Sequence, residues 1–193
     1  MSTIWQRRPI LAATVIEGML IPLALLLAFV LGIRPWEAFE ISGTALAKGV
    51  IATLPMLLFF GAVARMRFAW VREIEDKIRT VLLPMFRNSG RMAIIWVALL
   101  AGIAEELLFR GVIQAGLESW LGEATGLLLA SLVFGLVHYI TRAYFILATL
   151  MGLYLGLLYQ WTGNLLVPVL VHALYDWIAL EWYLHRERRR EAG

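Results

Sequence analysis

Several ionisable side chains interrupt apolar stretches that are long enough to cross a membrane. They are Glu17, Glu105, Glu106, Arg110, His138, His172 and Asp176. A charge at the centre of a bilayer costs at least about 2.5 kcal/mol, so such residues face protein or water and mark functional sites by default. Glutamate and histidine are common general bases. The set therefore predicts acid–base chemistry inside the membrane.

The two adjacent glutamates have different expected partners. Glu106 and Arg110 are four residues apart, so they share a helix face and can form an ion pair. Glu105 points about 100° away around the helix, where Arg110 cannot easily reach it. The spacing predicts that an ion pair holds the Glu106 carboxylate. It leaves the Glu105 carboxylate free to act as a base. The alternative is a structural role, in which both carboxylates only hold the helices of the bundle together.

The histidines and Glu17 are less specific when each is taken alone. His172 and Asp176 are four residues apart, so the carboxylate can orient the ring and fix its tautomer, or the pair can simply join helices. His138 by itself would be an ordinary residue near a membrane boundary. Glu17 either faces a cavity or hydrogen-bonds to a neighbour, and we assign it no catalytic role.

Composition indicates an integral membrane protein. The chain has 193 residues, of which 61% are hydrophobic, against about 45–50% in soluble domains. We expect an all-α, polytopic helix bundle that forms a single membrane domain over residues 1–193. The absence of cysteine excludes thiolate catalysis and iron–sulfur clusters. The basic residues behind the net charge of +3 flank the apolar segments, which favours anionic lipid over nucleic acid as a partner.

The apolar segments must position these side chains. They predict six transmembrane helices, at 10–31, 46–64, 92–115, 121–140, 143–161 and 164–184. The first is expected to be an uncleaved anchor. With the N-terminus inside, fourteen basic residues including Arg7 lie on the cytoplasmic side and two, Arg34 and Lys48, lie opposite, so both termini are expected in the cytoplasm. In straight spans His138 lies only about 5 Å from the cytoplasmic end and Glu105 about 20 Å, so the fourth span must tilt or end early, with 139–143 dipping inward.

Two further segments have recognisable patterns. Residues 68–86 predict an amphipathic helix in the cytoplasmic interface, bent or ended by Pro84, which connects two spans or gates substrate. Its expected apolar face comprises Trp70, Val71, Ile74, Ile78, Val81, Leu82 and Met85. Gly152 and Gly156 form a GxxxG motif, which we expect to pack within the monomer.

Three motifs stand in order on three predicted spans. They are Glu105-Glu106-Leu-Leu-Phe-Arg110, Phe134-Gly-Leu-Val-His138 and His172-Ala-Leu-Tyr-Asp176. Together they resemble the CAAX protease and bacteriocin-processing (CPBP, or Abi) family, which includes the type II prenyl-protein endopeptidases. The resemblance covers about residues 92–180, the expected catalytic core, and residues 1–91 carry no matching motif.

The resemblance implies a role for each motif residue. Glu105 would activate water with His138 helping to hold it, and Glu106 and Arg110 would brace the site. His172 and the residue four further on would stabilise the oxyanion. An asparagine there can donate a hydrogen bond, whereas Asp176 can do so only when protonated, or it can orient His172 instead. The family is described both as glutamic-type and as metalloprotease, so Glu105, His138 and His172 are candidate zinc ligands, although we favour a reaction without metal.

The expected function is an intramembrane endopeptidase of the cell membrane that acts on a membrane-anchored protein or peptide. Candidate substrates are a prenylated C-terminus, a bacteriocin leader or a sorting-signal helix. A non-enzymatic scaffold or immunity factor with the same fold is the second reading. A metal or proton carrier is the third, although the sequence shows no sign of two related halves.

Overall fold

The computed structural model describes residues 8–192, and these form helices without a β-strand. The long helices are α2 (Pro9–Leu31), α3 (Gly43–Val63), α6 (Arg91–Leu108), α8 (Glu123–Val137), α9 (Arg142–Thr162) and α10 (Leu166–Ala192). Short elements connect them: η1 (Pro35–Ala38), α4 (Ala69–Lys77), η2 (Ile78–Leu82), α5 (Leu83–Phe86), η3 (Phe109–Gln114) and α7 (Ala115–Leu121). Arg7, which the charge count includes, lies outside the described residues.

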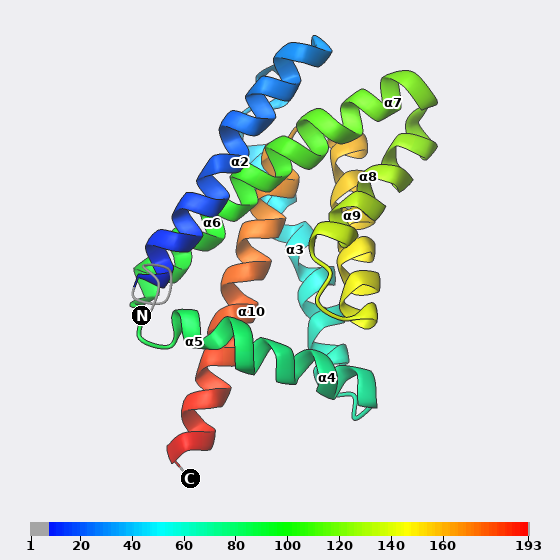
Figure 1. Ribbon diagram of the computed structural model, residues 1–193. Helices are drawn as coiled ribbons and strands as arrows, with labels where there is room; N and C mark the ends of the chain where they lie inside the picture. The colour runs from blue at the N-terminus through cyan, green and yellow to red at the C-terminus, as the bar shows by residue number, and fades with distance from the viewer. Residues whose placement is uncertain (1–7, 193) are drawn as a thin grey trace.

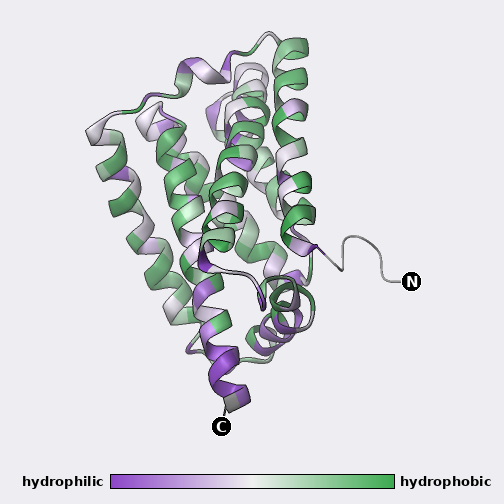
Figure 2. Cartoon of the chain, turned by 90° about the vertical axis from the view of Figure 1, so that its left-hand side faces the viewer, coloured by the Kyte–Doolittle hydropathy of each residue, from purple (hydrophilic) through white to green (hydrophobic). Residues whose placement is uncertain are grey.

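The protein is a multi-pass membrane helix bundle. Helices α2, α3, α9 and the continuous segment Arg91–Leu121 are long and apolar enough to cross a bilayer. Large apolar side chains such as Phe29 and Leu58 are exposed on them, as expected for contact with lipid. Figure 2 shows the upright helices mainly in green, with purple gathered at the lower end of α10.

Two of the predicted spans differ from this pattern. Helix α8 has 15 residues and a length of about 22 Å, shorter than the roughly 30 Å of a hydrocarbon core. Helix α10 is long enough, but it carries His172, Asp176 and Glu181 along its length. That α8 and α10 cross the membrane remains a prediction.

Helix α6 occupies a central place in the bundle. It packs against α2 on one side and α10 on the other, while α3 packs on α10 and α8 on α9. The approach of α10 is closest at Gly102, where a Cβ would lie 2.9 Å from the Val169 carbonyl oxygen and 3.0 Å from the Ala173 Cβ. Because a glycine lets the backbones come this close, α10 passes α6 one turn before Glu106.

The GxxxG motif of α9 packs within the chain, as predicted. A Cβ on Gly152 would lie 3.2 Å from the Ser131 Cα on α8, and one on Gly156 would overlap the side chains of Leu127 and Gln114. The motif therefore holds α9 against α8 and η3.

The amphipathic segment is interrupted, which corrects the prediction of one helix over 68–86. A π-helical turn, η2, separates α4 from α5 and makes room for Pro84, which has no N–H to donate. A π-helical turn contains about one residue more than an α-helical turn. The buried face of the segment therefore shifts around the helix axis after η2. Val81 and Leu82, expected on the apolar face, are therefore exposed, and Leu83 and Phe86 are buried instead.

These short helices close the end of the bundle at which α2 begins and α10 ends (Figure 1). Their buried face packs on a cluster that includes Ala13 of α2 and Leu184 of α10. Ion pairs of Arg186 with Glu75 and of Arg87 with Glu191 join them to α10. The segment is thus packed onto the bundle as well as amphipathic.

The predicted fourth span ends early. Helix α8 stops at Val137, His138 follows at its C-terminus, and α9 begins after Thr141, whose hydroxyl accepts a hydrogen bond from the Tyr144 N–H. Thr141 is buried, whereas Tyr139 and Ile140 are exposed. Arg142 is also exposed and Ala143 is half-buried, so the predicted inward dip of 139–143 is right for Thr141 and wrong for Tyr139, Ile140 and Arg142.

Candidate active site

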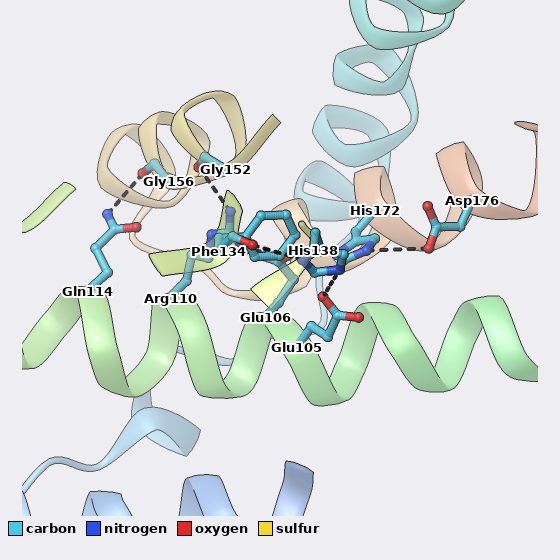
Figure 3. A network of polar contacts seen from close by, with 10 residues as sticks. All are labelled: Glu105, Glu106, Arg110, Gln114, Phe134, His138, Gly152, Gly156, His172 and Asp176. Atoms are coloured by element: carbon cyan, nitrogen blue, oxygen red, sulfur yellow. Dashed lines mark hydrogen bonds and ion pairs between the residues drawn. The ribbon is translucent and has the colours of Figure 1, made fainter. Parts of the chain in front are cut away.

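Four helical segments bring the six predicted site residues together. Glu105 and Glu106 lie on α6, Arg110 on η3, His138 after α8, and His172 and Asp176 on α10. In Figure 3 their polar ends converge between the helices.

Glu106 makes two short contacts with one carboxylate oxygen. Its Oε1 lies 2.7 Å from an Arg110 guanidinium nitrogen and 2.7 Å from the His172 Nδ1. Glu106 is fully buried and Arg110 is 1% exposed. A buried charge must be compensated, and the expected i,i+4 ion pair provides this compensation.

Arg110 also holds a second helix. It donates a hydrogen bond of 2.9 Å to the Gly152 carbonyl of α9, and its guanidinium lies 4.6 Å from the centre of the Phe134 ring. The ring of His138 also lies beside Phe134, with the two ring centres 4.4 Å apart. Arg110 thus links η3, α8 and α9 around the site.

His172 is oriented mainly by Glu106. Since the Glu106 Oε1 that contacts His172 also accepts from Arg110, the His172 Nδ1 is the donor, and Nε2 is left facing Asp176. The distance from Nε2 to the Asp176 Oδ2 is 3.4 Å, longer than the 2.7 Å to Glu106. Asp176, expected to orient the ring, therefore makes only the weaker contact.

His138 and Glu105 form the second part of the site. The His138 Nδ1 lies 2.8 Å from the Phe134 carbonyl oxygen, which can only accept, so Nδ1 carries a proton. Nε2 then faces the Glu105 Oε2 at 3.3 Å. That oxygen is buried and forms no hydrogen bond with any described residue. Glu105 contacts His138 whereas Glu106 pairs with Arg110 and His172, so the two glutamates have different partners.

A cavity of about 590 Å³ opens beside these groups. Glu105, His138, His172 and Asp176 line it, and most of the other lining residues are apolar. Glu106 and Arg110 are not among the residues that line the cavity. A water molecule or a peptide that enters the cavity therefore meets Glu105 rather than Glu106.

One residue of the site was missed by sequence reasoning. Gln114 is fully buried and donates hydrogen bonds to the Glu118 carboxylate at 2.8 Å and to the Gly156 carbonyl at 3.2 Å. Together with the bond from Arg110 to Gly152, it forms two successive links from η3 to α9 (Figure 3). The signal was present in the sequence, because Glu106, Arg110, Gln114 and Glu118 recur every four residues.

The candidate zinc ligands do not fit a metal centre in this arrangement. Within residues 8–192 no three His, Asp or Glu side chains are placed to hold one ion. Glu105, His138 and His172 line one cavity but are not placed as a three-ligand set.

Comparison with known proteins identifies the segment that carries the site. Residues 87–178 match the family described as type II CAAX prenyl endopeptidase Rce1-like. This segment is similar to the Rce1-like family. The match contains all three motifs and agrees with the family resemblance seen in the sequence. Helices α2 and α3 precede the Rce1-like segment.

The chain is also similar to a bacterial protein. It is 43% identical over 95 residues to "Uncharacterized protein YpbD" of Bacillus subtilis, a stretch that covers 48% of this chain and 46% of YpbD. The chain therefore spans less than half the length of this relative. No solved structure matches the chain.

Proposed function

We propose that the protein is a membrane-embedded endopeptidase that hydrolyses a peptide bond of a membrane-associated protein or peptide. One observation carries the proposal: Glu105 faces the cavity with a buried oxygen that lacks a hydrogen-bond partner among the described residues, beside His138. Such a carboxylate is suited to take a proton from water. The Rce1-like segment supports the peptidase class.

In the proposed reaction Glu105 removes a proton from water as the water oxygen attacks the peptide carbonyl carbon. The carbonyl π electrons move to its oxygen and give a tetrahedral oxyanion. When this intermediate collapses, the C–N bond breaks and the protonated Glu105 donates its proton to the leaving amine. The products are an acid and an amine, and Glu105 returns to its starting state.

His172 is the proposed donor to the oxyanion. Its Nδ1 proton is held by Glu106, so in the imidazolium form the second proton, on Nε2, points toward Asp176 and the cavity. A fixed donor aimed at developing charge stabilises the transition state without reorganisation. We assign Asp176 the role of holding this Nε2–H until the substrate carbonyl arrives.

His138 is the proposed positioning partner of Glu105. The Phe134 carbonyl fixes its Nδ1 proton, so the ring is locked with Nε2 toward the carboxylate. Glu106 and Arg110 position His172 from behind the cavity wall. The mostly apolar cavity wall suits a substrate segment that is itself apolar, as in a membrane-anchored peptide.

The test uses the purified full chain in lipid nanodiscs. Farnesylated peptides and peptides with an apolar transmembrane segment are incubated with it, and new termini are read by mass spectrometry. We expect Glu105→Gln to lower cleavage by about 10²–10⁴-fold, the contribution of a general base, with unchanged thermal unfolding. Glu73→Gln, which changes an exposed carboxylate on α4, should cleave like wild type.

The outcomes separate the three functional readings. Wild-type rates in Glu105→Gln would contradict the mechanism. No cleavage by wild type, together with no effect of Glu105→Gln on a cellular phenotype, would favour a scaffold. Uptake of metal or protons into proteoliposomes that depends on Glu105 would favour a carrier.

A further inference from the structure

Glu17 lies in the cavity of the candidate active site, although it belongs to α2 and lies outside the Rce1-like segment. Its Oε2 is buried and forms no hydrogen bond with any described residue. Glu105, His138, His172 and Asp176 line the same cavity. Glu17 therefore faces the site, and the proposed hydrolysis does not use it.

The cavity has more carboxyl groups than basic side chains. Glu17, Glu105 and Asp176 line it together with His138 and His172, whereas no lysine or arginine is among the described residues that line it. Glu105 is 7% exposed, and its Oε2 likewise has no hydrogen-bond partner among the described residues. Glu17 on α2 and Glu105 on the neighbouring α6 thus line the same cavity, and each has a buried carboxylate oxygen without a hydrogen bond to any described residue.

A carboxylate in apolar surroundings is costly unless a cation or a hydrogen-bond donor reaches it. No lysine or arginine among the described lining residues reaches Glu17, so a cationic group of a bound molecule would supply its counter-charge. A cavity lined by one sign of charge favours ligands of the opposite sign and rejects like charges. The expected occupant next to Glu17 is the ammonium or guanidinium group of a peptide side chain.

We propose that Glu17 is a specificity-determining residue that binds a lysine or arginine side chain of the substrate close to the scissile bond. The inference rests on the proposed peptidase function. Glu105 activates the water that attacks the peptide carbonyl, and Glu17, from the neighbouring helix, fixes the register of the peptide by holding the cation. An acidic side chain at the same substrate position is rejected.

The test compares peptides with a leucine-rich membrane anchor that differ at one position near the cleaved bond, where they carry lysine, norleucine or glutamate. The full chain in liposomes should show a kcat/KM ratio of lysine to norleucine of about tenfold, the effect of one close charge pair. Glu17→Gln should bring this ratio toward one, and Glu17→Lys should shift the preference to glutamate. Glu73→Gln is the matched control and should keep the wild-type ratio.

A binding measurement tests the role of Glu17 independently of the proposed peptidase function. In the Glu105→Gln background the uncleaved lysine peptide should bind about tenfold more tightly than the norleucine peptide, and the added change Glu17→Gln should abolish this difference. If wild type cleaves none of the peptides, the proposed function fails and the binding result still decides the role of Glu17. A lysine preference that persists in both Glu17→Gln and Glu17→Lys would overturn the inference.

Discussion

A single carboxylate oxygen of Glu106 lies 2.7 Å from both Arg110 and the His172 Nδ1. Glu106 and His172 are 66 residues apart in the chain, so this contact joins α6 to α10. Because the oxygen accepts from Nδ1, it fixes which nitrogen of His172 faces the cavity. The Glu106–Arg110 ion pair, which lies outside the cavity, thereby fixes the orientation of the His172 ring, which lines the cavity.

The first prediction concerns this buried pair. Glu106→Leu leaves the Arg110 charge uncompensated and should lower the free energy of unfolding by about 3–5 kcal/mol. The double change Glu106→Leu with Arg110→Leu should recover most of that stability, because no buried charge remains, yet stay inactive, because His172 loses its acceptor. Denaturant titration in detergent and a cleavage assay measure the two effects. An active double variant would contradict the role given to Glu106.

The second prediction concerns Asp176. An asparagine at this position can donate a hydrogen bond to the oxyanion, so Asp176→Asn should keep activity within about threefold of wild type, whereas Asp176→Leu should lower kcat on the order of 10²-fold. Steady-state kinetics with one peptide distinguishes them. If the asparagine variant is as inactive as the leucine variant, the carboxylate itself is required as the acceptor for the His172 Nε2.

The third prediction concerns His138. Its ring contacts Glu105 and the Phe134 carbonyl. His138→Ala should therefore lower kcat by about 10²-fold with little change in KM, since it disturbs the base. Tyr139→Phe, a change at the exposed neighbouring residue, is the control and should behave as wild type. A KM effect without a kcat effect would show that His138 binds substrate instead.

The fourth prediction concerns the contribution of Gln114 to the stability of the fold. Gln114→Leu leaves the Gly156 carbonyl and one oxygen of Glu118 without this donor, which should cost about 1–3 kcal/mol of unfolding free energy. Gln160→Leu removes another donor to Glu118 at a more exposed site and should cost less. Thermal unfolding followed by fluorescence or light scattering compares the stabilities of the two variants. Equal stability of both variants and wild type would show that the link from η3 to α9 is dispensable.

The fifth prediction concerns metal. Because the described His, Asp and Glu side chains do not form a three-ligand set, EDTA and 1,10-phenanthroline should leave the cleavage rate within about twofold of its starting value. Metal analysis of the purified protein accompanies the assay. Loss of activity on chelation that zinc restores would show instead that Glu105, His138 and His172 rearrange around an ion.

The local features of this protein follow from its sequence. The apolar composition determines an all-α membrane bundle, and the spacing of Glu106 and Arg110 determines their ion pair, because residues four apart on a helix always share a face. The three motifs similarly indicate the family and the residues that gather at the site. Among these, the ion pair depends only on neighbours along the chain.

Tertiary structure decided the rest. The partner of His172 is Glu106 rather than the Asp176 four residues away, since the close passage of α10 at Gly102 brings the two helices together. The short α8 carries His138 to Glu105, and the π turn at Ile78–Leu82 moves the buried face from Val81 to Leu83. Regular periodicity predicts a face only while the helix stays regular, and the helix crossings that form the site depend on packing between distant segments.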